Sequence, residues 1–465
     1  MHNSIGIRRI LNDNYNFFST EQSMKQLSLF LCLKYLGGKK ILLLSIAAVA
    51  MSCALLITVS SLFTGFIGAI ENSADEHLGD IVIGAPAAMT ISKYDRLISS
   101  LEASDYIEAA TAVLSGQGLL HLGKGTGDVR AARIWGIEPA SRSKVTPFAN
   151  LLIKHKNGTE PPTLTAADDT DGIAGFVGIG VVARPDDVTD EYDFKQVNAS
   201  IGRRVFLTTG TRELKPKTIK FAIADVVFSG VHEFDKDFVY LPIDVLADKL
   251  YPSQGKVADM IQIRLSDGAS PESALAVVRG IWRNFAQKEL GWSNYAILLT
   301  KINTSRQMQA KLLAEYKKQM GMLMLIFGVV SAGVVLLIFC IFYLIVITKQ
   351  KDIAVVKSCG LSSASVGTLF LVFGFVTGFI GSGLGVVIGY LFTKNVNYVE
   401  RLISVVFGLK LWKSSTYMFT RIPNQVNWES VIWIGVAAVF AAAAGALIPA
   451  IAAATVRPVK ILRYE

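Results

Sequence analysis

The sequence predicts an α-helical membrane protein with four transmembrane helices and a large α+β extracytoplasmic (periplasmic) domain between the first and second helices. Composition is the first indication: hydrophobic residues are 51% of the 465 residues and charged residues only 18%, a balance that soluble domains of this length rarely show. The second is the presence of four runs without Asp, Glu, Lys or Arg, each longer than the ~20 residues that a helix needs to cross a bilayer. These runs are Ile41 to Ile70, Met320 to Thr348, Leu361 to Thr393 and Ser430 to Val456.

Residues 1–26 are predicted to be a polar N-terminal extension, with Met24 as an alternative start. Residues 27–70 are predicted to contain an amphipathic helix at the inner membrane surface and then the first transmembrane helix, with lysines available to anionic membrane lipid. A simple stop before the span explains the same lysines equally well. The span is too long and too far from the N-terminus for a cleaved signal peptide, so we expect an anchor.

Basic residues lie beside the apolar runs and give the chain a formal net charge of +9. They precede the first run, separate the second from the third and follow the fourth, so the positive-inside rule places these groups and both termini in the cytoplasm. The loop at 394–429 argues weakly against this orientation, because it contains five basic residues: Lys394, Arg401, Lys410, Lys413 and Arg421. An even number of crossings overrides it. This distribution forms no nucleic-acid-binding stripe, and no nucleic acid partner is expected.

Residues 71–318 are predicted to form the periplasmic α+β domain with a helical stalk, and they suffice for a separate core. Period-two apolar patterns predict strands at Asp80 to Ile83, Gly118 to Leu122, Val129 to Trp135, Arg204 to Thr208, Ile219 to Val227 and Phe238 to Leu241. Helical patterns lie at Ser92 to Ala103, Ile243 to Leu250 and Pro271 to Phe285. A further helix from Thr304 to Lys318, without Gly or Pro, continues into the second transmembrane helix at 319–348 as a rigid stalk. Residues 154–172 are polar, contain two prolines and predict a mobile loop.

No constellation in the sequence indicates catalysis or a metal site. Gly118, Gly123 and Lys124 imitate a phosphate-binding loop, but Gly125 occupies the position that needs Ser or Thr to hold magnesium. The HEFDKD segment at 232–237 lacks metal-ligand spacing and is predicted to be a polar turn. The four cysteines lie in or beside apolar runs and form neither a disulfide framework nor a Cys-x-x-Cys site. We therefore expect no catalytic residue, metal or cofactor in this chain.

The apolar spans contain no acidic or basic residue, whereas carriers driven by ion gradients need such residues within the bilayer. The third transmembrane helix, predicted at 367–393, instead has glycines three or four residues apart, which allow close helix packing in lipid: Gly374, Gly378, Gly381, Gly385 and Gly389. Packing within one chain explains these glycines at least as well as association between chains. Because four spans make only a thin conduit, we expect a second permease copy or a paralogue to complete a dimer.

A charged segment at 349–366, between the second and third spans, is predicted to be a cytoplasmic coupling helix. Some of its side chains can face water and others offer an apolar surface: Lys349, Lys351, Asp352 and Lys357 in the first group, Ile353, Val355 and Val356 in the second. Gly360 permits the left-handed turn that ends a helix, and Ser362 or Ser363 can cap the next one. A loop that merely collects lysines is the plain alternative. The remaining predicted segments are a short periplasmic loop at 394–429, the fourth transmembrane helix at 430–456 and a cytoplasmic tail at 457–465.

Three segments resemble the FtsX and MacB class of ABC transporter permeases, and within it the lipoprotein-releasing permeases of the LolC and LolE type. The segment at 349–366 reads KQKDIAVVKSCGLSSASV, close to that family's R-E-I-x-x-L-[RK]-x-[LM]-G-A-S stretch. The C-terminus from Ile448 reads IPAIAAATVRPVKILRYE and resembles the family's P-A-x-x-A-A-x-x-x-P-V-x-x-L-R-Y-E ending. The segment at 228–250 is similar to the end of the family's outer domain. The family pattern has other residues at three positions of the first segment, namely Asp352, Cys359 and Leu361.

The resemblance implies a permease subunit without catalysis of its own. A separate ABC ATPase, holding ATP and magnesium, would dock against Lys351, Asp352, Ile353, Val356, Lys357 and Gly360. Its motion would pass through the spans and the stalk to the outer domain, and an acylated lipoprotein substrate would be released from the inner membrane to a periplasmic carrier protein. A MacB-like exporter and an FtsX-like regulator of a cell-wall hydrolase share the architecture and are alternatives, although the regulator's outer domain is typically much smaller.

Overall fold

The computed structural model describes residues 40–123, 128–155, 162–164, 172–186, 189–210, 215–358, 360–408 and 410–462. They form two compact units. The membrane unit consists of the residues up to Gly65, Lys318–Asn395 and the residues from Asn424, and the outer unit of Phe66–Lys317 and Val396–Pro423. The N-terminal extension and amphipathic helix predicted from the sequence lie outside the described residues, as does most of the loop predicted at 154–172.

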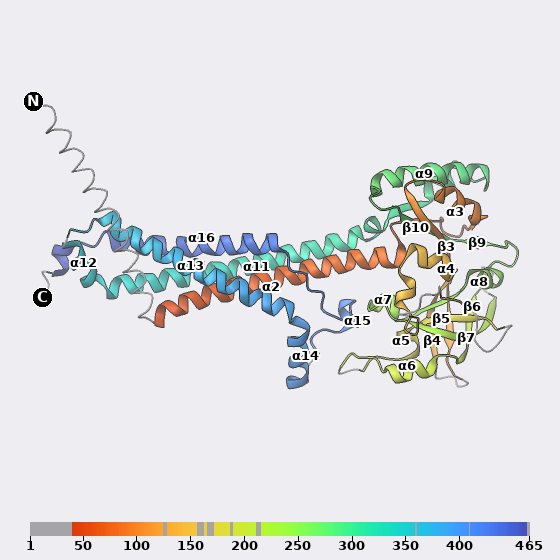
Figure 1. Ribbon diagram of the computed structural model, residues 1–465, viewed down its shortest axis with the longest axis horizontal. Coiled ribbons are helices and arrows are strands. Elements are labelled where there is room, and N and C mark those ends of the chain that lie inside the picture. Colours follow the sequence, from red (N-terminus) through yellow and green to blue (C-terminus); the bar gives the residue numbers. More distant parts are fainter. Residues whose placement is uncertain are drawn as a thin grey trace, which may run out of the picture. The chain divides into compact units, whose positions relative to one another are not determined.

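Four described helices are long and apolar enough to cross a membrane, which confirms the predicted number of spans. They are α2 (Lys40–Leu78), α11 (Ser305–Thr348), α13 (Ser363–Lys394) and α16 (Trp428–Ala454). Helix α13 packs along α16 (Figure 1). Two short helices, α12 (Gln350–Ser358) and α17 (Pro458–Leu462), pack against each other.

Helices α2 and α11 are both longer than a bilayer requires. They contain 39 and 44 residues, and at 1.5 Å per residue their lengths are about 58 and 66 Å. The hydrocarbon core of a bilayer is only ~30 Å thick. Each helix continues without a break from the membrane unit into the outer unit. The continuous helix predicted from Thr304 through the second span is therefore confirmed, and α2 is a second helix of this kind.

The outer unit contains a nine-stranded sheet in the order β11-β1-β10-β3-β4-β8-β5-β7-β6 and a two-stranded sheet of β2 and β9. The strands are β1 (Ile81–Gly84), β2 (Ile91–Ser92), β3 (Ile107–His121), β4 (Val129–Ile137), β5 (Ala174–Gly178), β6 (Arg204–Gly210), β7 (Pro216–Val227), β8 (Phe238–Pro242), β9 (Val257–Ala258), β10 (Met260–Leu265) and β11 (Lys301–Thr304). The long strand β3 pairs with β10 through its first half and with both β4 and β6 through its second half. The β3–β6 pairing closes the strands from β3 to β6 into a ring.

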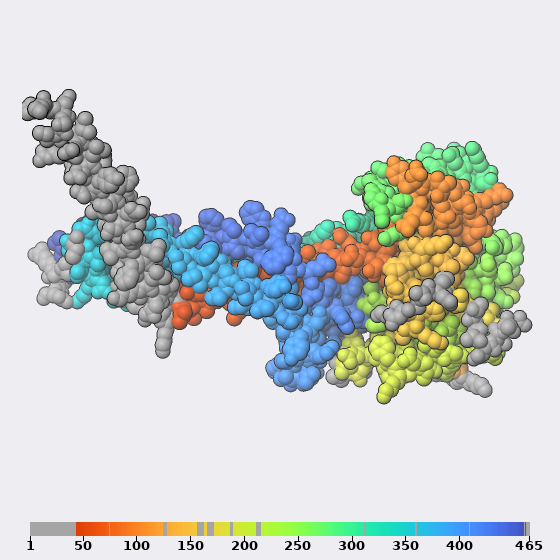
Figure 2. Space-filling view, in the orientation of Figure 1, coloured from red at the N-terminus to blue at the C-terminus, as the bar shows by residue number. Residues whose placement is uncertain are grey.

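Strands β1 and β11 are antiparallel neighbours, with Ile81 opposite Thr304. Because β1 follows α2 and β11 precedes α11, the chain leaves and rejoins the long helices through adjacent strands. Ile81 and Ile83 alternate toward one face of the sheet and belong to the large apolar core of the outer unit. Helices α3 (Tyr94–Glu102) and α9 (Pro271–Lys288) contribute to the same core and pack against each other (Figure 2).

The other helices complete an α+β unit, so the predicted fold class is confirmed. They are α4 (Pro139–Val145), the 3₁₀ helix η1 (Phe148–Leu151), α5 (Ile179–Val182), α6 (Phe194–Ser200), α7 (His232–Asp235), α8 (Ile243–Leu250), α10 (Asn294–Leu299), α14 (Val396–Phe407) and α15 (Ser414–Tyr417). Every strand and helix predicted for the domain is present, with ends shifted by a few residues except in β3, which begins 11 residues before the predicted Gly118. The strands not predicted from the sequence are β2, β5, β9, β10, β11 and the first half of β3, and the region of α14 was predicted as loop.

Candidate coupling site

Helix α12 has one face fixed to its neighbours and one face uncovered. Ile353 and Ala354 are buried with Val346, Phe370 and Ala450 in a small apolar cluster of the membrane unit. Val355 and Val356, on the other face, are 51% and 41% exposed. The sequence predicted an apolar surface of Ile353, Val355 and Val356. In the described chain Ile353 is buried, and the two valines remain accessible to another protein.

Lys357 was predicted to face water, but its side chain is bonded within the chain. Its Nζ donates to the carbonyl oxygens of Ala454 and Val456 at 2.8 and 2.7 Å, at the C-terminal end of α16. A cation is stabilised there by the helix dipole and by carbonyls that lack helical partners. Lys357 therefore fastens α12 to α16, whereas Asp352, which pairs with Lys349, remains half exposed.

The turn after α12 has the geometry that the sequence indicated. Gly360 has φ +100° and donates its N–H to the carbonyl of Lys357 at 3.1 Å. No atom lies within 4 Å of the position that a Cβ would occupy at Gly360, so backbone conformation alone favours glycine there. Ser362 then caps α13 by accepting the N–H of Ser365 at 3.1 Å. The turn thus fixes the direction in which α13 leaves α12.

The five glycines predicted to pack α13 face two different partners. Gly374 and Gly378 lie against α16, at Ala446 and Ala442. The remaining three lie against α2, opposite Val49, Cys53 and Ile57: they are Gly381, Gly385 and Gly389. The structure therefore places these glycines at contacts within the chain, where an added Cβ would meet the backbone or the Cβ of the neighbouring helix.

In the outer unit, the adjacent ends of α2 and α11 are tied together. The hydroxyl of Ser305, the first residue of α11, donates to the carboxylate of Asp75 in α2. The backbone N–H of Ser305 also donates to the carbonyl of Asp80 at 3.0 Å. The side-chain carboxylate of Asp80 accepts the N–H of Leu265, in β10, at 2.8 Å. The end of one long helix, the start of the other and the sheet therefore share one hydrogen-bonded junction.

A buried arginine completes this junction. Arg142 is 1% exposed; its Nη2 donates to the carbonyl of His77 at the end of α2, 3.1 Å away, and its Nη1 to Gln262 Oε1 at 2.9 Å. Its guanidinium lies over the rings of Trp135 and Phe148, 4.9 and 5.2 Å from their centroids. Burial lowers the pKa of Arg142 to about 10, so the side chain remains charged at neutral pH. Sequence reasoning missed Arg142, because its partners are far away in the chain.

The loop between α13 and α16 also contributes to the outer unit. Phe419 forms an antiparallel bridge with Val231, and the carbonyl of Met418 accepts the N–H of His232 at 2.6 Å. The ring of Phe419 packs edge-on against Phe66 of α2, with 5.7 Å between centroids. Phe66 also meets Tyr316 of α11 at 4.9 Å. Residues from four parts of the sequence therefore meet in one cluster of the outer unit.

Asp235 holds the domain side of this contact. It is almost fully buried and accepts the N–H and hydroxyl of Ser229, both at 2.8 Å, and the N–H of Gly230 at 2.9 Å. Burial raises the pKa of Asp235 to about 7, against the opposing effect of these hydrogen bonds. The carbonyl of Gly230 accepts the N–H of Thr420 from the loop at 3.0 Å. Asp235 therefore shapes the segment to which the loop is bonded.

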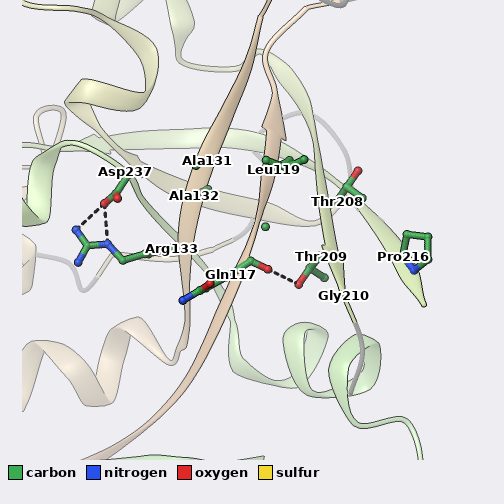
Figure 3. A pocket seen from close by; sticks show the side chains of 11 residues that line it. Gln117, Leu119, Ala131, Ala132, Arg133, Thr208, Thr209, Gly210, Pro216 and Asp237 are labelled. Atoms are coloured by element: carbon green, nitrogen blue, oxygen red, sulfur yellow. Dashed lines mark hydrogen bonds and ion pairs between the residues drawn. The ribbon is translucent and has the colours of Figure 1, made fainter. Parts of the chain in front are cut away.

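The other polar candidates in the outer unit have structural roles. The HEFDKD segment forms α7 and leads into β8, and its Glu233 and Asp237 both pair with Arg133 of β4. Figure 3 shows Arg133 turned to Asp237 at an open groove of about 630 Å³ over β3, β4 and β6. In the same groove the hydroxyl of Thr209 donates to the carbonyl of Gln117 at 2.8 Å. Gly118 of the phosphate-loop imitation lies within β3, as its alternating pattern predicted.

A bundle of apolar helices with a large α+β unit inserted between the first and second spans defines a class of membrane permeases. Residues 324–458 match the FtsX-like permease C-terminal family. Residues 42–281, about half of the chain, match the MacB-like periplasmic core domain, and the chain belongs to this family. The resemblance to the FtsX and MacB class is thus confirmed.

Similar proteins are found over almost the whole length of the chain. It is 26% identical over 464 residues to the lipoprotein-releasing system transmembrane protein LolC of Neisseria meningitidis serogroup B, which covers 95% of this chain and 100% of that protein. It is 24% identical to LolC of Xylella fastidiosa over 94% of this chain and 99% of that protein. Among solved structures, the periplasmic region of MacB from Actinobacillus actinomycetemcomitans is similar over 50% of this chain and 91% of that one, with 15% identity and a TM-score of 0.31.

Proposed function

We propose that this chain is the permease subunit of an ABC transporter that releases lipoproteins from the inner membrane. The observation that carries the proposal is the end-to-end similarity to LolC, a lipoprotein-releasing system protein, which extends over both units. The absence of acidic and basic residues from the apolar runs supports an acyl-chain substrate, because acyl chains need no charged pathway. Both termini and α12 lie in the cytoplasm in this proposal, and the outer unit lies in the periplasm.

The energy comes from a separate ATPase, which holds ATP and magnesium. It docks on the exposed face of α12, with Lys351, Asp352 and Val356 as contacts. Ile353, Lys357 and Gly360 act indirectly, because they set the position of α12 on α13 and α16. A motion of α12 is passed to the outer unit by α11, which is continuous from Ser305 to Thr348.

Two permease chains, identical or paralogous, form the conduit, because a single bundle of four spans encloses little space. A lipoprotein enters from the outer leaflet with its acyl chains between the spans. Movement of the outer units then expels it to a periplasmic carrier. The tie between the ends of α2 and α11, at Asp75 and Ser305, supports this scheme because both long helices then move the sheet together.

Mass spectrometry on the tagged chain, purified gently from its native membrane, tests the function. An ABC ATPase recovered together with triacylated lipoproteins is the expected result. An ATPase recovered with an outer-membrane channel and without lipoproteins would instead favour export in the manner of MacB, the second candidate, which the match to the MacB-like core domain supports. A cell-wall hydrolase in place of both would refute transport.

The docking face is tested by Val356→Asp. A carboxylate in a buried protein interface without a partner is strongly unfavourable, so we expect ATPase binding to weaken by roughly tenfold or more and lipoprotein release to fall with it. The matched control is Val129→Asp, on β4 of the outer unit, where the valine is 37% exposed. Unchanged ATPase binding by Val356→Asp would remove α12 as the docking site and leave the lipoprotein result untouched.

A further inference from the structure

Helix α14 (Val396–Phe407) has its polar and apolar faces in the reverse of the usual arrangement. Its buried side carries Val396 and Glu400, and the side-chain amide of Asn397 accepts the N–H of Ile422 at 2.9 Å and donates to the carbonyl of Ile422 at 3.1 Å. Its uncovered side is apolar, with side chains 51–80% exposed: Tyr398, Leu402, Val405, Val406 and Phe407. A helix packed on a domain in water normally turns its apolar stripe inward, so this outward stripe needs a covering.

The chain itself shows where that stripe lies. Helix α13, one of the four membrane spans, ends at Lys394, and α14 begins two residues later at Val396. The start of α14 is therefore at the membrane surface. Two spans, α11 and α13, lie between the α+β sheet and α14 in the chain, so α14 and the sheet lie on the same side of the bilayer.

The charges around α14 fit a phospholipid surface. Lys394 lies at the end of the span, and Arg401 is exposed on α14. Lys410 is turned inward, with its Nζ 3.6 Å from the carboxylate of Glu400. The acidic group is therefore neutralised inside the loop, while cations remain beside the apolar stripe. Helices that lie in a membrane interface combine an apolar face with basic flanks in this way.

We propose that α14 lies in the interface of the leaflet next to the outer unit, with its apolar stripe among the lipid headgroups and upper acyl chains. The loop at 396–423 bonds to the α+β sheet through Phe419 and Val231, so α14 attaches the outer unit to the lipid surface independently of α2 and α11. The proposal also explains the exposed Lys394 and Arg401 without reversing the orientation of the chain, because these two cations lie beside the lipid-facing stripe, whereas Lys410 pairs with Glu400. It does not depend on what the protein transports.

Photocrosslinking of the unmodified full chain tests the proposal. The chain is reconstituted in vesicles of phosphatidylethanolamine and phosphatidylglycerol that contain a phospholipid with a diazirine near the top of one acyl chain, and labelled peptides are mapped by mass spectrometry. Helix α10 (Asn294–Leu299) is the internal control. Its Tyr295 and Leu298 are 72% and 80% exposed, so α10 also offers apolar side chains. In the chain, however, α10 is separated from the second span by the first 14 residues of α11, Ser305 to Lys318, which are about 21 Å of helix.

We expect the peptide that contains 396–407 to be labelled at least fivefold more than the α10 peptide. We also expect the double variant Val405→Asp with Phe407→Asp to lose most of this labelling while the four spans remain labelled, which shows that the variant is inserted. Equal labelling of α14 and α10 would overturn the proposal. The proposal would also be overturned if the acyl-chain probe did not label α14 and a protein-to-protein crosslinker did, because the apolar stripe would then be covered by a protein.

Discussion

Gly383 and Gly385 lie two residues apart on α13 but have different surroundings. A Cβ on Gly385 would be 2.7 Å from both the carbonyl oxygen of Ala50 and the Cβ of Cys53, on α2. A Cβ on Gly383 would meet nothing within 4 Å. Close approach of α13 to α2 therefore requires glycine at one of these positions and not at the other.

We expect Gly385→Val to force α2 away from α13 and to destabilise the membrane unit by about 1–3 kcal/mol, the usual effect of overpacking. Gly383→Val is the matched control. It should change stability by less than about 1 kcal/mol, because the added side chain meets no neighbour at Cβ and valine favours a helix slightly more than glycine does. The measurement is the temperature at which detergent-purified protein loses its monodisperse peak in gel filtration. Equal losses for the two variants would show that the α2–α13 contact is not tight.

A pH dependence is expected from Asp235. Burial raises its pKa to about 7, above its ordinary value of 3.8, so between these values the folded protein keeps a proton that the unfolded chain releases. The free energy of unfolding should therefore fall as the pH rises from about 4 to about 7, by at most about 1.4 kcal/mol per pH unit. Asp235→Asn does not titrate and should lack this slope; its amide oxygen can still accept the bonds of Ser229, but the N–H of Gly230 loses its acceptor. Thermal unfolding of both proteins across this range measures the difference, and identical slopes would contradict it.

Local signals in the sequence were sufficient for Gly360 and Ser362, because a left-handed turn and a helix cap depend on neighbouring residues. Arg142 could not be identified in this way. It lies in PASRSKV, which is typical of an exposed helix, and it is buried by partners that lie 65 and 120 residues away in the chain. The position of Lys357 could not be predicted either, because the carbonyls that it bonds, at the end of α16, lie about a hundred residues later in the chain.

At the scale of elements, the continuity of α11 is the feature with the clearest functional test. Insertion of two glycines after Lys317 should break the helix between its membrane part and its outer part, because glycine disfavours helix by about 1 kcal/mol per residue. We expect ATP hydrolysis by the associated ATPase to continue while lipoprotein release falls by roughly tenfold or more. The measurement is both activities in the same proteoliposomes.

The matched control is the same insertion beside Gly268, an exposed turn glycine with φ +81° and nothing within 4 Å of its Cβ position. Release should be retained there. If the insertion in α11 also retained release, force would have to reach the outer unit by another route, of which α2 is the obvious one.

The elements that sequence analysis missed share a physical cause. The first half of β3 reads IEAATAVLS, and its alanines favour a helix by propensity, but pairing with β10 overrides that preference. β5 reads AGFVG and is buried throughout, so it has no alternation to detect. Helix α14 was overlooked because its apolar residues face away from the protein, which makes the pattern in sequence compatible with a loop beside a membrane.

For the molecule as a whole, the number of spans and the α+β class could be predicted because both follow from composition along the chain. Long uncharged runs are sufficient to locate membrane helices, and the segment between the first two was too long to lack a core. The order of strands could not be predicted. The closure of β6 onto β3 joins residues about 90 positions apart, and no local pattern records such a pairing.

The pairing of Ile81 with Thr304 places the two ends of the α+β domain beside each other. These two ends lie one strand spacing apart, about 4.8 Å, although more than two hundred residues separate them in the chain. The spacing of α2 and α11 where they meet the sheet is therefore set by this one strand pair and not by the length of the chain between the two strands.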